Sequence, residues 1–345
     1  MENNPLVSII TPSFNRADIV SETALSIFRQ SYVYWEWIIV DDGSTDNSWD
    51  VLQQFAARDS KVKVFQRDRE PKGACSCRNI AVERSSGEYL LFLDTDDLLA
   101  PYCLEQRIKA AKEYQVFDFL IFPMLLFKQH PADLRLLWNI DKEVDEVDRL
   151  LFGDPVCQGT GTLWKKDSFV KMGMWDESLL LWQDIELHLR AFTRGLNYVK
   201  CLHLKPDVFL RISDVSLSRT GYHSIPKLRS RLQVFMNTAN TLFEKNSIGT
   251  YRQGLRYLFI DLFLNAMRVN YFILADELFS VSNKYNLFSV REDRVFKKCM
   301  FLYRLKLYKM PGVQGRLLNR VMQLEKAREI TLGKQIYSEG IVCER

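Results

Sequence analysis

Two hydrophobic periods alternate over the first hundred residues of the chain. Short, mostly apolar runs that end in turn residues are typical of strands, and they occupy 6–14, 35–44, 61–68 and 88–97. Stretches with apolar residues three and four positions apart are typical of amphipathic helices, and they occupy 16–30, 48–59 and 74–87. This alternation predicts an α/β fold with a doubly wound, mostly parallel sheet flanked by helices.

Polar side chains gather where three of the predicted strands end. They form the segments Thr11–Arg16, Asp41–Asp46 and Asp94–Asp97. Because the carboxyl ends of parallel strands share one edge of the sheet, we expect these segments to converge on a ligand site. The chain has neither a GxGxxG dinucleotide fingerprint nor a GxxxxGK[ST] phosphate loop, so the sequence predicts a site of another kind.

The pattern loosens after residue 100. The apolar runs at 116–127 and 198–204 predict further strands, and a helix is predicted from about 182 to 194. Beyond 219 the pattern predicts helices with a basic surface. We therefore divide the chain into a main domain at 1–218 and a basic helical C-terminal region at 219–345.

Charge is distributed unevenly along the chain. The net charge of +4 conceals 25 basic and 33 acidic side chains in 1–218, against 22 basic and 10 acidic side chains in 219–345. The segment 291–310 interleaves seven Lys and Arg with apolar residues, which is typical of a basic amphipathic helix. Such a helix either rests on an anionic membrane surface or packs in a bundle with its basic face in solvent. We expect no nucleic-acid role, because no recognisable nucleic-acid-binding module accompanies the charge.

Two features favour a reduced, cytoplasmic protein. No secretory signal is visible at the N-terminus, and the apolar run at 116–127 is shorter than the roughly 20 residues that span a bilayer. The seven cysteines are odd in number and lack the spacing of a disulfide framework. Cys75 and Cys77 are too close for a CxxC redox pair, and we interpret them as inert thiols.

Asp94, Asp96 and Asp97 directly follow the fourth predicted strand. Buried carboxylates repel one another and are costly unless their charge is compensated. One interpretation is a helix cap, in which Asp96 or Asp97 starts a helix near Pro101. The other is a divalent metal site, because Mn²⁺ or Mg²⁺ takes its oxygen ligands from a few carboxylates and from substrate phosphates.

Four segments, in order and at matching spacing, resemble the inverting family 2 glycosyltransferases. They are VSIITPSFNR, IIVDDGSTDNS, ACSCRNIAVERSSGEYLLFLDTDDLL and MGMWDESLLLWQDIELHLR, and the resemblance covers roughly residues 5–218. It implies a GT-A catalytic domain with a nucleotide-binding half at 1–100 and an acceptor half at 101–218. It also implies inverting transfer from a nucleotide sugar, with a UDP-sugar favoured, to a hydroxyl of a saccharide or lipid-linked saccharide in cell-surface polysaccharide or glycan biosynthesis. A lipid-linked acceptor would bring such an enzyme into peripheral contact with the inner membrane face.

The resemblance assigns roles at the donor side. Asp42 is expected to accept a hydrogen bond from uracil N3–H, while Asp41 holds the turn. Arg78 is expected near the diphosphate and the acids, since a guanidinium can pair with either. The other wall of the base pocket would comprise Pro12, Ser13, Phe14 and Asn15, with Phe14 available to stack on the base.

The segment Asp94-Thr95-Asp96 matches the family's DXD motif and is expected to bind the nucleotide sugar. Asp96 is the expected main ligand of Mn²⁺ or Mg²⁺, with Asp94 and Asp97 as further ligands. RISDVSLS, which begins at Arg211, resembles the family's flexible loop over the donor diphosphate. Many members have His where this chain has Ser213, so the resemblance carries over Arg211 but not that His.

Asp184 is the expected catalytic base, because an inverting transfer needs one base on the acceptor side to take the hydroxyl proton. The family commonly has Glu-Asp here, and this chain has Gln183-Asp184. Glu186 is the competing base, although it points to another side of the helix. His188 lies one turn after Asp184, where a lone histidine is more often packed than catalytic.

The acceptor side matches the segment around GTGTLWKK, at 159–166. Trp164 and Trp182 could each stack on a sugar ring or pack in the core, and both alternatives stay open. The expected contacts to acceptor or sugar are Gly161, Trp164, Trp182 and Gln183.

Two other functions compete with this one. A non-catalytic nucleotide-sugar-binding subunit of a glycan assembly complex would need no base, and the presence of both Asp96 and Asp184 argues against it. A nucleotidyltransferase would need a glycine-rich, basic phosphate loop after the first strand, and TPSFNR is not such a loop.

Overall fold

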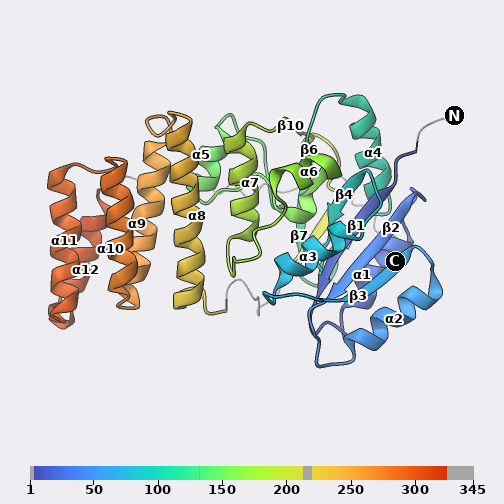
Figure 1. Cartoon of the computed structure of the whole chain (residues 1–345), viewed down its shortest axis with the longest axis horizontal. Helices are drawn as coiled ribbons and strands as arrows, with labels where there is room; N and C mark the ends of the chain where they lie inside the picture. Colours follow the sequence, from blue (N-terminus) through green and yellow to red (C-terminus); the bar gives the residue numbers. More distant parts are fainter. Residues whose placement is uncertain (1–3, 132, 213–219, 325–345) are drawn as a thin grey trace.

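The computed structural model describes residues 4–131, 133–212 and 220–324 (Figure 1). Its centre is a seven-stranded sheet with the order β10-β6-β9-β4-β1-β2-β3. Neighbouring strands are parallel except at β9, which runs antiparallel to both β4 and β6. The strands are β1 (Val7–Ser13), β2 (Trp35–Asp41), β3 (Val62–Gln66), β4 (Tyr89–Phe92), β6 (Phe119–Ile121), β9 (Thr162–Lys165) and β10 (Tyr198–Lys200).

Helices cover both faces of this sheet, which explains why its strands are apolar at consecutive positions. Ile9 belongs to the core on one face and its neighbour Ile10 to the core on the other, and both are fully buried. The first face packs against α1 (Val20–Phe28), α2 (Ser48–Arg58) and α4 (Cys103–Glu113). The second packs against α3 (Ala74–Glu83), α6 (Lys166–Met172) and α7 (Gln183–Arg194). The predicted doubly wound, mostly parallel sheet is confirmed.

The apolar run at 116–127, predicted as one strand, forms two strands in different sheets. Pro123, which has no N–H to donate, lies between β6 and β7 (Met124–Phe127). The second sheet has the order β5-β11-β7-β8, with β5 at Leu98–Leu99, β8 at Leu136–Leu137 and β11 at Val208–Arg211. Strand β11 therefore runs beside the segment that follows the acidic triplet.

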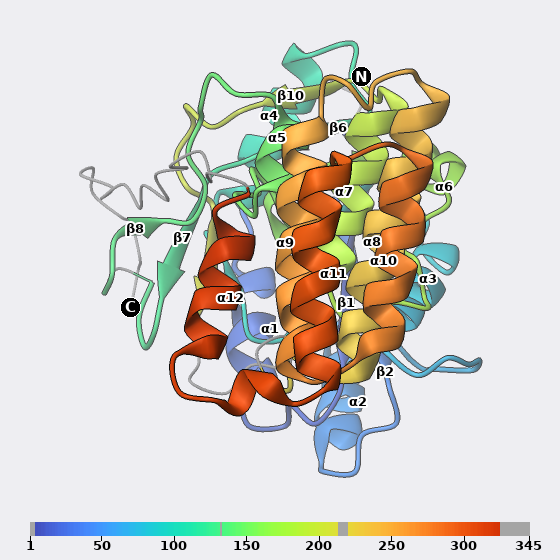
Figure 2. The same ribbon diagram turned by 90° about the vertical axis from the view of Figure 1, so that its left-hand side faces the viewer.

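The C-terminal region is a set of helices stacked beside α7 (Figures 1 and 2). It comprises α8 (Ile225–Glu244), α9 (Arg252–Arg268), α10 (Phe272–Lys284), α11 (Val290–Arg304), η2 (Leu307–Lys309) and α12 (Val313–Met322). Its core is continuous with Leu150 of α5 (Glu146–Leu151) and Leu189 of α7. The apolar stretch of α9 is buried in this core through Phe259, Leu262 and Phe263, so protein and not lipid covers it. In the segment 291–310, Phe296 and Met300 pack in the same core, whereas Phe301 and Leu305 are exposed, so packing in the bundle accounts for part of its apolar residues.

Within the described part of the chain, no helix has both the length and the apolar character needed to cross a bilayer. The six described cysteines are free and buried. Burial raises the pKa of the Cys75 thiol to about 12 and also raises that of Cys77. Thiols of this kind stay protonated and are poor nucleophiles, in agreement with the interpretation of both residues as inert.

Candidate active site

Three carboxylates lie just beyond β4, and the surrounding protein compensates their charges only in part. The side chain of Asp94 is 41% exposed, whereas Asp97 is buried. Burial, followed by the charge of Asp94, raises the pKa of Asp96. Burial also raises the pKa of Asp97, and the charges of Asp96 and Asp94 raise it further. Carboxylates with raised pKa values at this edge of the sheet favour the binding of a cation.

Arg78 links these acids to the start of α7. Its Nη2 donates to Asp94 Oδ1 at 2.6 Å, and its Nη1 donates to Gln183 Oε1 at 3.4 Å. The guanidinium lies 4.8 Å from the ring centroid of Trp175, and its buried Nε has no partner among the described residues. Burial is the largest single influence and acts to lower the pKa of Arg78, but the charges of Asp94 and Asp184 and the hydrogen bond to Asp94 act with others to raise the pKa overall. The positively charged guanidinium of Arg78 therefore lies between two groups of predicted site residues, the acids after β4 and the residues at the start of α7.

Asp97 is held by the protein on both of its carboxylate oxygens. The backbone N–H of Arg211 donates to Oδ1 at 3.0 Å, and Thr160 Oγ1 donates to Oδ2 at 3.4 Å. The prediction of Asp97 as a metal ligand is therefore wrong, because its carboxylate is buried and engaged. The alternative of a helix cap is also wrong, since α4 begins at Cys103 behind Tyr102, without a side-chain cap.

The remaining acids suit a divalent cation that brings other ligands with it. Among the described residues, His, Cys, Asp and Glu form no group of three or more that could hold a metal ion. Mg²⁺ and Mn²⁺ need only one or two protein carboxylates when substrate phosphates and waters complete their coordination. Asp94 and Asp96 offer such a pair, and the raised pKa of Asp96 shows that it lacks a full counter-charge. Thr95, buried between them, is fixed by its carbonyl, which accepts from Thr23 Oγ1 at 2.9 Å.

The second acidic pair lies at the end of β2, and its two members differ in role. The carboxylate of Asp41 accepts hydrogen bonds from the backbone N–H groups of Gly43 and Ser44, as expected for a turn residue. Asp42 is buried, and its Oδ1 accepts from Arg67 Nε at 2.6 Å. Sequence reasoning missed Arg67, which directly follows β3 and gives no signal in the motif. Asp42 is thus an oriented acid that keeps a charge partner.

The end of β1 supplies the facing loop. Pro12 and Ser13 stand beside Val40 and Asp41 in the parallel register. Asn15 has a left-handed backbone (φ 52°) and is pinned across the gap, because its N–H donates to Ser44 Oγ at 2.9 Å. The Nζ of Lys72 lies 3.9 Å from the ring centroid of Phe14. The two predicted walls of the base pocket, 12–15 and 41–42, are therefore brought together as expected.

Asp184 lies in the first turn of α7 with one carboxylate oxygen oriented by the protein. The N–H of Gly159 donates to its Oδ1 at 2.7 Å. Glu186 is buried in a bidentate pair with Arg190, at 2.7 and 2.9 Å, and so does not offer a free base. His188 is fully buried beside Phe119, and burial lowers its pKa. The helix therefore presents Asp184, and not Glu186 or His188, at its exposed start.

Two predicted acceptor contacts are wrong. Trp164 is fully buried, stacks on Phe119 at a centroid distance of 4.2 Å and donates to Thr162 Oγ1. Gly161 is also buried, and a Cβ there would lie only 2.4 Å from Met124 Sδ. Both belong to η1 (Gly159–Gly161) and β9, which the sequence pattern presented as a loop. Trp182, in contrast, is partly exposed at the start of α7.

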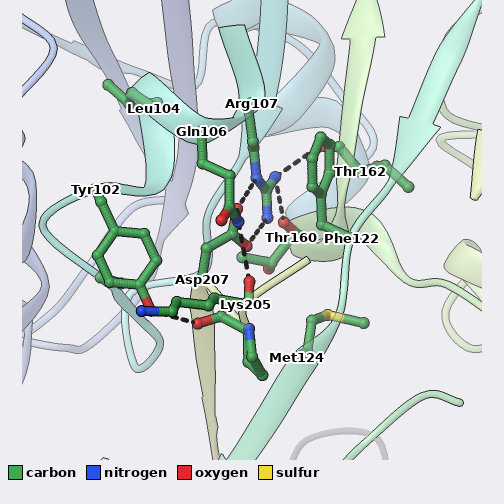
Figure 3. Close-up of polar contacts among 12 residues, drawn as sticks. Tyr102, Leu104, Gln106, Arg107, Phe122, Met124, Thr160, Thr162, Lys205 and Asp207 are labelled. Atoms are coloured by element: carbon green, nitrogen blue, oxygen red, sulfur yellow. Dashed lines mark hydrogen bonds and ion pairs between the residues drawn. The ribbon is translucent and has the colours of Figure 1, made fainter. Parts of the chain in front are cut away.

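A buried ion pair outside the predicted set holds η1 in place (Figure 3). Arg107 and Asp207 are both inaccessible to solvent, with Nε and Nη2 of Arg107 at 2.9 and 2.8 Å from the two carboxylate oxygens. Arg107 Nη1 also donates to the carbonyls of Thr160 and Thr162. Because η1 contacts Asp184 through Gly159 and Asp97 through Thr160, this pair positions both sides of the candidate site. The only signal in the sequence is an arginine within an apolar helical face.

Arg211, expected in a loop over the donor diphosphate, ends strand β11 and lies at the acidic edge. Its Nε donates to the carbonyl of Asp96 at 3.0 Å, and its Nη2 pairs with Glu22 at 2.6 Å. Its guanidinium therefore braces the turn after β4. The expectation for Ser213 lies outside the described residues.

Comparisons with known proteins agree with this geometry. Residues 8–173 match the family described as glycosyl transferase family 2. TuaG of Bacillus subtilis, named as a teichuronic acid biosynthesis glycosyltransferase, is 40% identical over 130 residues, which are 37% of this chain and 51% of TuaG. WfgD of Escherichia coli, named as a UDP-Glc:alpha-D-GlcNAc-diphosphoundecaprenol beta-1,3-glucosyltransferase, is 38% identical over 103 residues, 30% of this chain and 40% of WfgD. The chain thus spans about half the length of these relatives or less.

Solved structures share the fold along most of the chain. TarS of S. aureus, residues 1–349 in complex with UDP, has a TM-score of 0.61 and 16% identity, and the match covers 92% of this chain and 90% of TarS 1–349. The mannosyltransferase PcManGT from Pyrobaculum calidifontis, in complex with GDP-Man and Mn²⁺, has a TM-score of 0.50 and 16% identity, with coverage of 94% and 88%. The match of residues 8–173 to glycosyl transferase family 2, over the parallel sheet and its acidic edge, supports a family 2 glycosyltransferase domain in this chain, and the likeness to TarS shows the GT-A fold.

Proposed function

We propose that this protein is an inverting glycosyltransferase that moves a sugar from a nucleotide sugar to a hydroxyl of a saccharide or lipid-linked saccharide. A UDP-sugar is the proposed donor, since the names or titles of WfgD and the TarS complexes include UDP-Glc, UDP or UDP-GlcNAc. Cell-surface polysaccharide biosynthesis in the cytoplasm is the proposed setting, in line with the name of TuaG.

One observation carries the proposal: Arg78 contacts both Asp94 and Gln183, the residue before Asp184. The acids expected to face the donor and the base expected to face the acceptor therefore flank one guanidinium. Transfer requires the donor diphosphate and the acceptor hydroxyl to lie side by side in this way. A surface that only binds a nucleotide sugar has no need for an oriented carboxylate on the acceptor side.

In this proposal each residue of the site has a separate role in binding the donor or activating the acceptor. Asp42 accepts from the base of the nucleotide, and Phe14 offers its ring as a stacking surface. Arg78 pairs with the diphosphate when the substrate arrives. Asp184, with Oδ1 held by Gly159, uses its other oxygen to take the proton of the attacking hydroxyl.

Asp96 and Asp94 are the residues that would hold Mn²⁺ or Mg²⁺. The donor set fits, because two acidic oxygens lie at an edge where burial and mutual repulsion raise the pKa of Asp96. When bound, the cation supplies positive charge that stabilises the leaving diphosphate. PcManGT, a neighbour in fold, is described in complex with Mn²⁺.

The decisive experiment compares two carboxylates of one helix in a transfer assay with Mn²⁺ and a panel of UDP-sugars and saccharide acceptors. Asp184→Asn should lower transfer by about 10²–10⁴-fold, the usual contribution of a general base, while UDP affinity stays within a few-fold of wild type. Glu186→Gln, which removes the charge paired with Arg190, should keep most of the transfer rate in the folded fraction. A fully active Asp184→Asn variant would contradict the assignment of the base.

The alternative of a non-catalytic nucleotide-sugar-binding subunit is tested with the wild-type protein. Donor turnover with Mn²⁺, and its loss with EDTA, supports the enzyme. UDP-sugar binding by calorimetry without transfer or hydrolysis, for any donor and acceptor tried, would support the binding subunit.

The far end of the helical region supports a further part of the proposal, peripheral contact with an anionic membrane surface. Helices α11 and α12 lie at the end of the molecule farthest from the sheet (Figure 1). Phe301, on α11, and Leu305, directly after it, are 57% and 53% exposed. Exposed cations surround them, at Arg294, Lys297, Lys298, Lys306 and Lys309. Apolar side chains within a basic surface suit the interface of an anionic bilayer.

This contact is tested by sedimentation with vesicles of phosphatidylcholine, with and without phosphatidylglycerol. Wild-type protein should sediment with the anionic vesicles only, and F301S/L305S should stay in solution. Ile273→Ser, which removes an equally exposed apolar side chain on α10, is the matched control. Equal sedimentation of all three proteins would contradict the membrane contact.

A further inference from the structure

The segment that leads into α7 is supported from behind by α8. Ser230 Oγ accepts from the N–H of Leu180 at 2.9 Å. One turn further along, Gln233 Nε2 donates to Asp176 Oδ2 at 3.0 Å and to Ser178 Oγ at 2.9 Å. Figure 1 shows α8 running beside α7. The segment that precedes the proposed base, Asp184, is therefore held partly by the C-terminal helices. The resemblance assigned no role to these helices.

Between these two contacts, Arg231 makes the closest approach to the site. It is fully buried, and its guanidinium carbon lies 4.5 Å from the ring centroid of Trp182 and 4.8 Å from that of Tyr222. Its Nη2 pairs with Asp261 of α9. Its Nε and Nη1 are buried without a hydrogen-bond partner in the described part of the chain.

A buried arginine with two unpaired donors is costly for a fold to keep. Burial also lowers the pKa of Arg231. Hydrophobic packing of α8 on α7 would be satisfied by an apolar side chain here. Asp261 pairs with one end of this guanidinium, and the contact with Trp182 gives the buried charge a second partner, on the segment that leads into α7.

Trp182 needs such a partner because its backbone is unfavourable. Its φ of 64° and ψ of 29° place it in the left-handed region, which is rare for a bulky residue. Its carbonyl accepts the first hydrogen bond of α7, from the N–H of Glu186 at 2.8 Å. The orientation of Trp182 thus fixes where the helix starts, and Asp184 lies two residues further on.

The donor side holds the other end of the same segment. Asn79 of α3 donates to the carbonyl of Trp175 at 2.9 Å and accepts from its N–H at 3.1 Å. Residues 175–182 are therefore tied to the nucleotide-binding half at one end and to the C-terminal helices at the other.

We propose that Arg231 is a positioning residue for transfer: by stacking on Trp182, it fixes the start of α7 and with it the carboxylate of Asp184 on the acceptor side. The part that concerns catalysis rests on the proposed function. The part that concerns geometry does not, since it states only that Arg231 holds the segment 176–184.

Three full-length variants test this: R231M, R231K and, as the matched control, R229M. Arg229 lies on the same helix, two residues away, and pairs with Glu277 at the surface. With R231M, we expect kcat for transfer to fall about 10–100-fold, as a misplaced reacting group does, while UDP affinity is unchanged. R231K keeps the charge and should recover part of that loss. R229M should behave as wild type.

Hydrogen exchange followed by mass spectrometry gives a readout that needs no activity. R231M should speed amide exchange in 176–184 and leave the core peptides of β1 and β4 as protected as in wild type, whereas R229M should change neither. Wild-type exchange in 176–184 for R231M and R231K would overturn the positioning role. If R231M does not fold, the exchange of R231K decides: faster exchange in 176–184 than in wild type supports the positioning role, and wild-type exchange overturns it. A wild-type protein without transfer activity would contradict the proposed function, while the exchange data would still test Arg231.

Discussion

Acidic side chains meet opposite conditions at the two ends of the molecule. At the edge of the sheet, burial and neighbouring acids raise the pKa of Asp96 and Asp97. In the helical region, the hydrogen bond from Arg256 and those within a capping box lower the pKa of Glu292 to about 2. Glu292 thus has its counter-charge within the helical region, in Arg256. At the sheet edge, burial and neighbouring acids leave Asp96 without full compensation, so that a ligand with positive charge can complete the edge.

The same comparison applies within the triplet. Asp97 is buried and hydrogen-bonded by β11 and by η1, whereas Asp94 is open to solvent. Raised pKa values alone would assign both Asp96 and Asp97 to the function. These contacts show that the carboxylate of Asp97 supports the turn, whereas the carboxylate of Asp94 remains available.

The largest effect is expected for Asp96→Asn. Loss of the proposed metal ligand should reduce transfer by more than about 100-fold, beyond the cost typical of a group that only orients a ligand. Stability should be equal or higher at pH 7, because a carboxyl whose pKa is raised by folding destabilises the fold when it is ionised. Transfer assays with Mn²⁺ and thermal unfolding in EDTA measure the two quantities. A variant that loses stability and keeps its activity would contradict the difference between the two regions.

A smaller effect is expected for Asp97→Asn. The amide oxygen can still accept from the N–H of Arg211, and the hydroxyl of Thr160 can turn to accept from the amide. Removing a buried charge beside Asp96 should then stabilise the protein at pH 7, because the ionised carboxyl destabilises the fold when folding raises its pKa. Transfer should stay within about tenfold of wild type, the lower end of the cost for a residue behind a metal ligand.

The pH dependence sharpens this prediction. Because folding raises the pKa of Asp97, the wild-type protein regains stability as the pH falls and the carboxyl takes up its proton. The difference in melting temperature between Asp97→Asn and wild type, measured in EDTA, should therefore shrink on going from pH 7 to about pH 4. A difference that grows on acidification would show that the carboxylate of Asp97 is needed in its charged form.

Local patterns were sufficient to predict the first hundred residues. Each of the first three strands is followed by a helix, and parallel pairing places the segments that follow β1, β2 and β4 on one edge. Long-range contacts decided the rest. Trp164 lies in an antiparallel strand inserted between β4 and β6, and short-range periodicity carries no information on such a partner. Arg67, Arg107 and Arg231 gave no motif signal, since their partners come from other strands and helices.

The smallest effect is expected for Glu292→Gln in the helical region. The carboxylate of Glu292 pairs with Arg256 at 2.7 Å and caps α11 with Ser289, which is worth about 1 kcal/mol at neutral pH. Because folding lowers its pKa from the ordinary 4.5 to about 2, this contribution is complete above pH 5 and is lost as the pH falls through that interval. The amount by which the melting temperature of Glu292→Gln falls below that of wild type should therefore shrink between about pH 5 and pH 3. The advantage of Asp97→Asn should shrink earlier, between pH 7 and about pH 4. Asp276→Asn is the matched control, since Asp276 pairs with Arg304 where both side chains are about half exposed and such pairs contribute little. If Glu292→Gln lost no stability at pH 7, the pair with Arg256 would not stabilise the helical region, and the contrast between Glu292 and the acids of the sheet edge would fail.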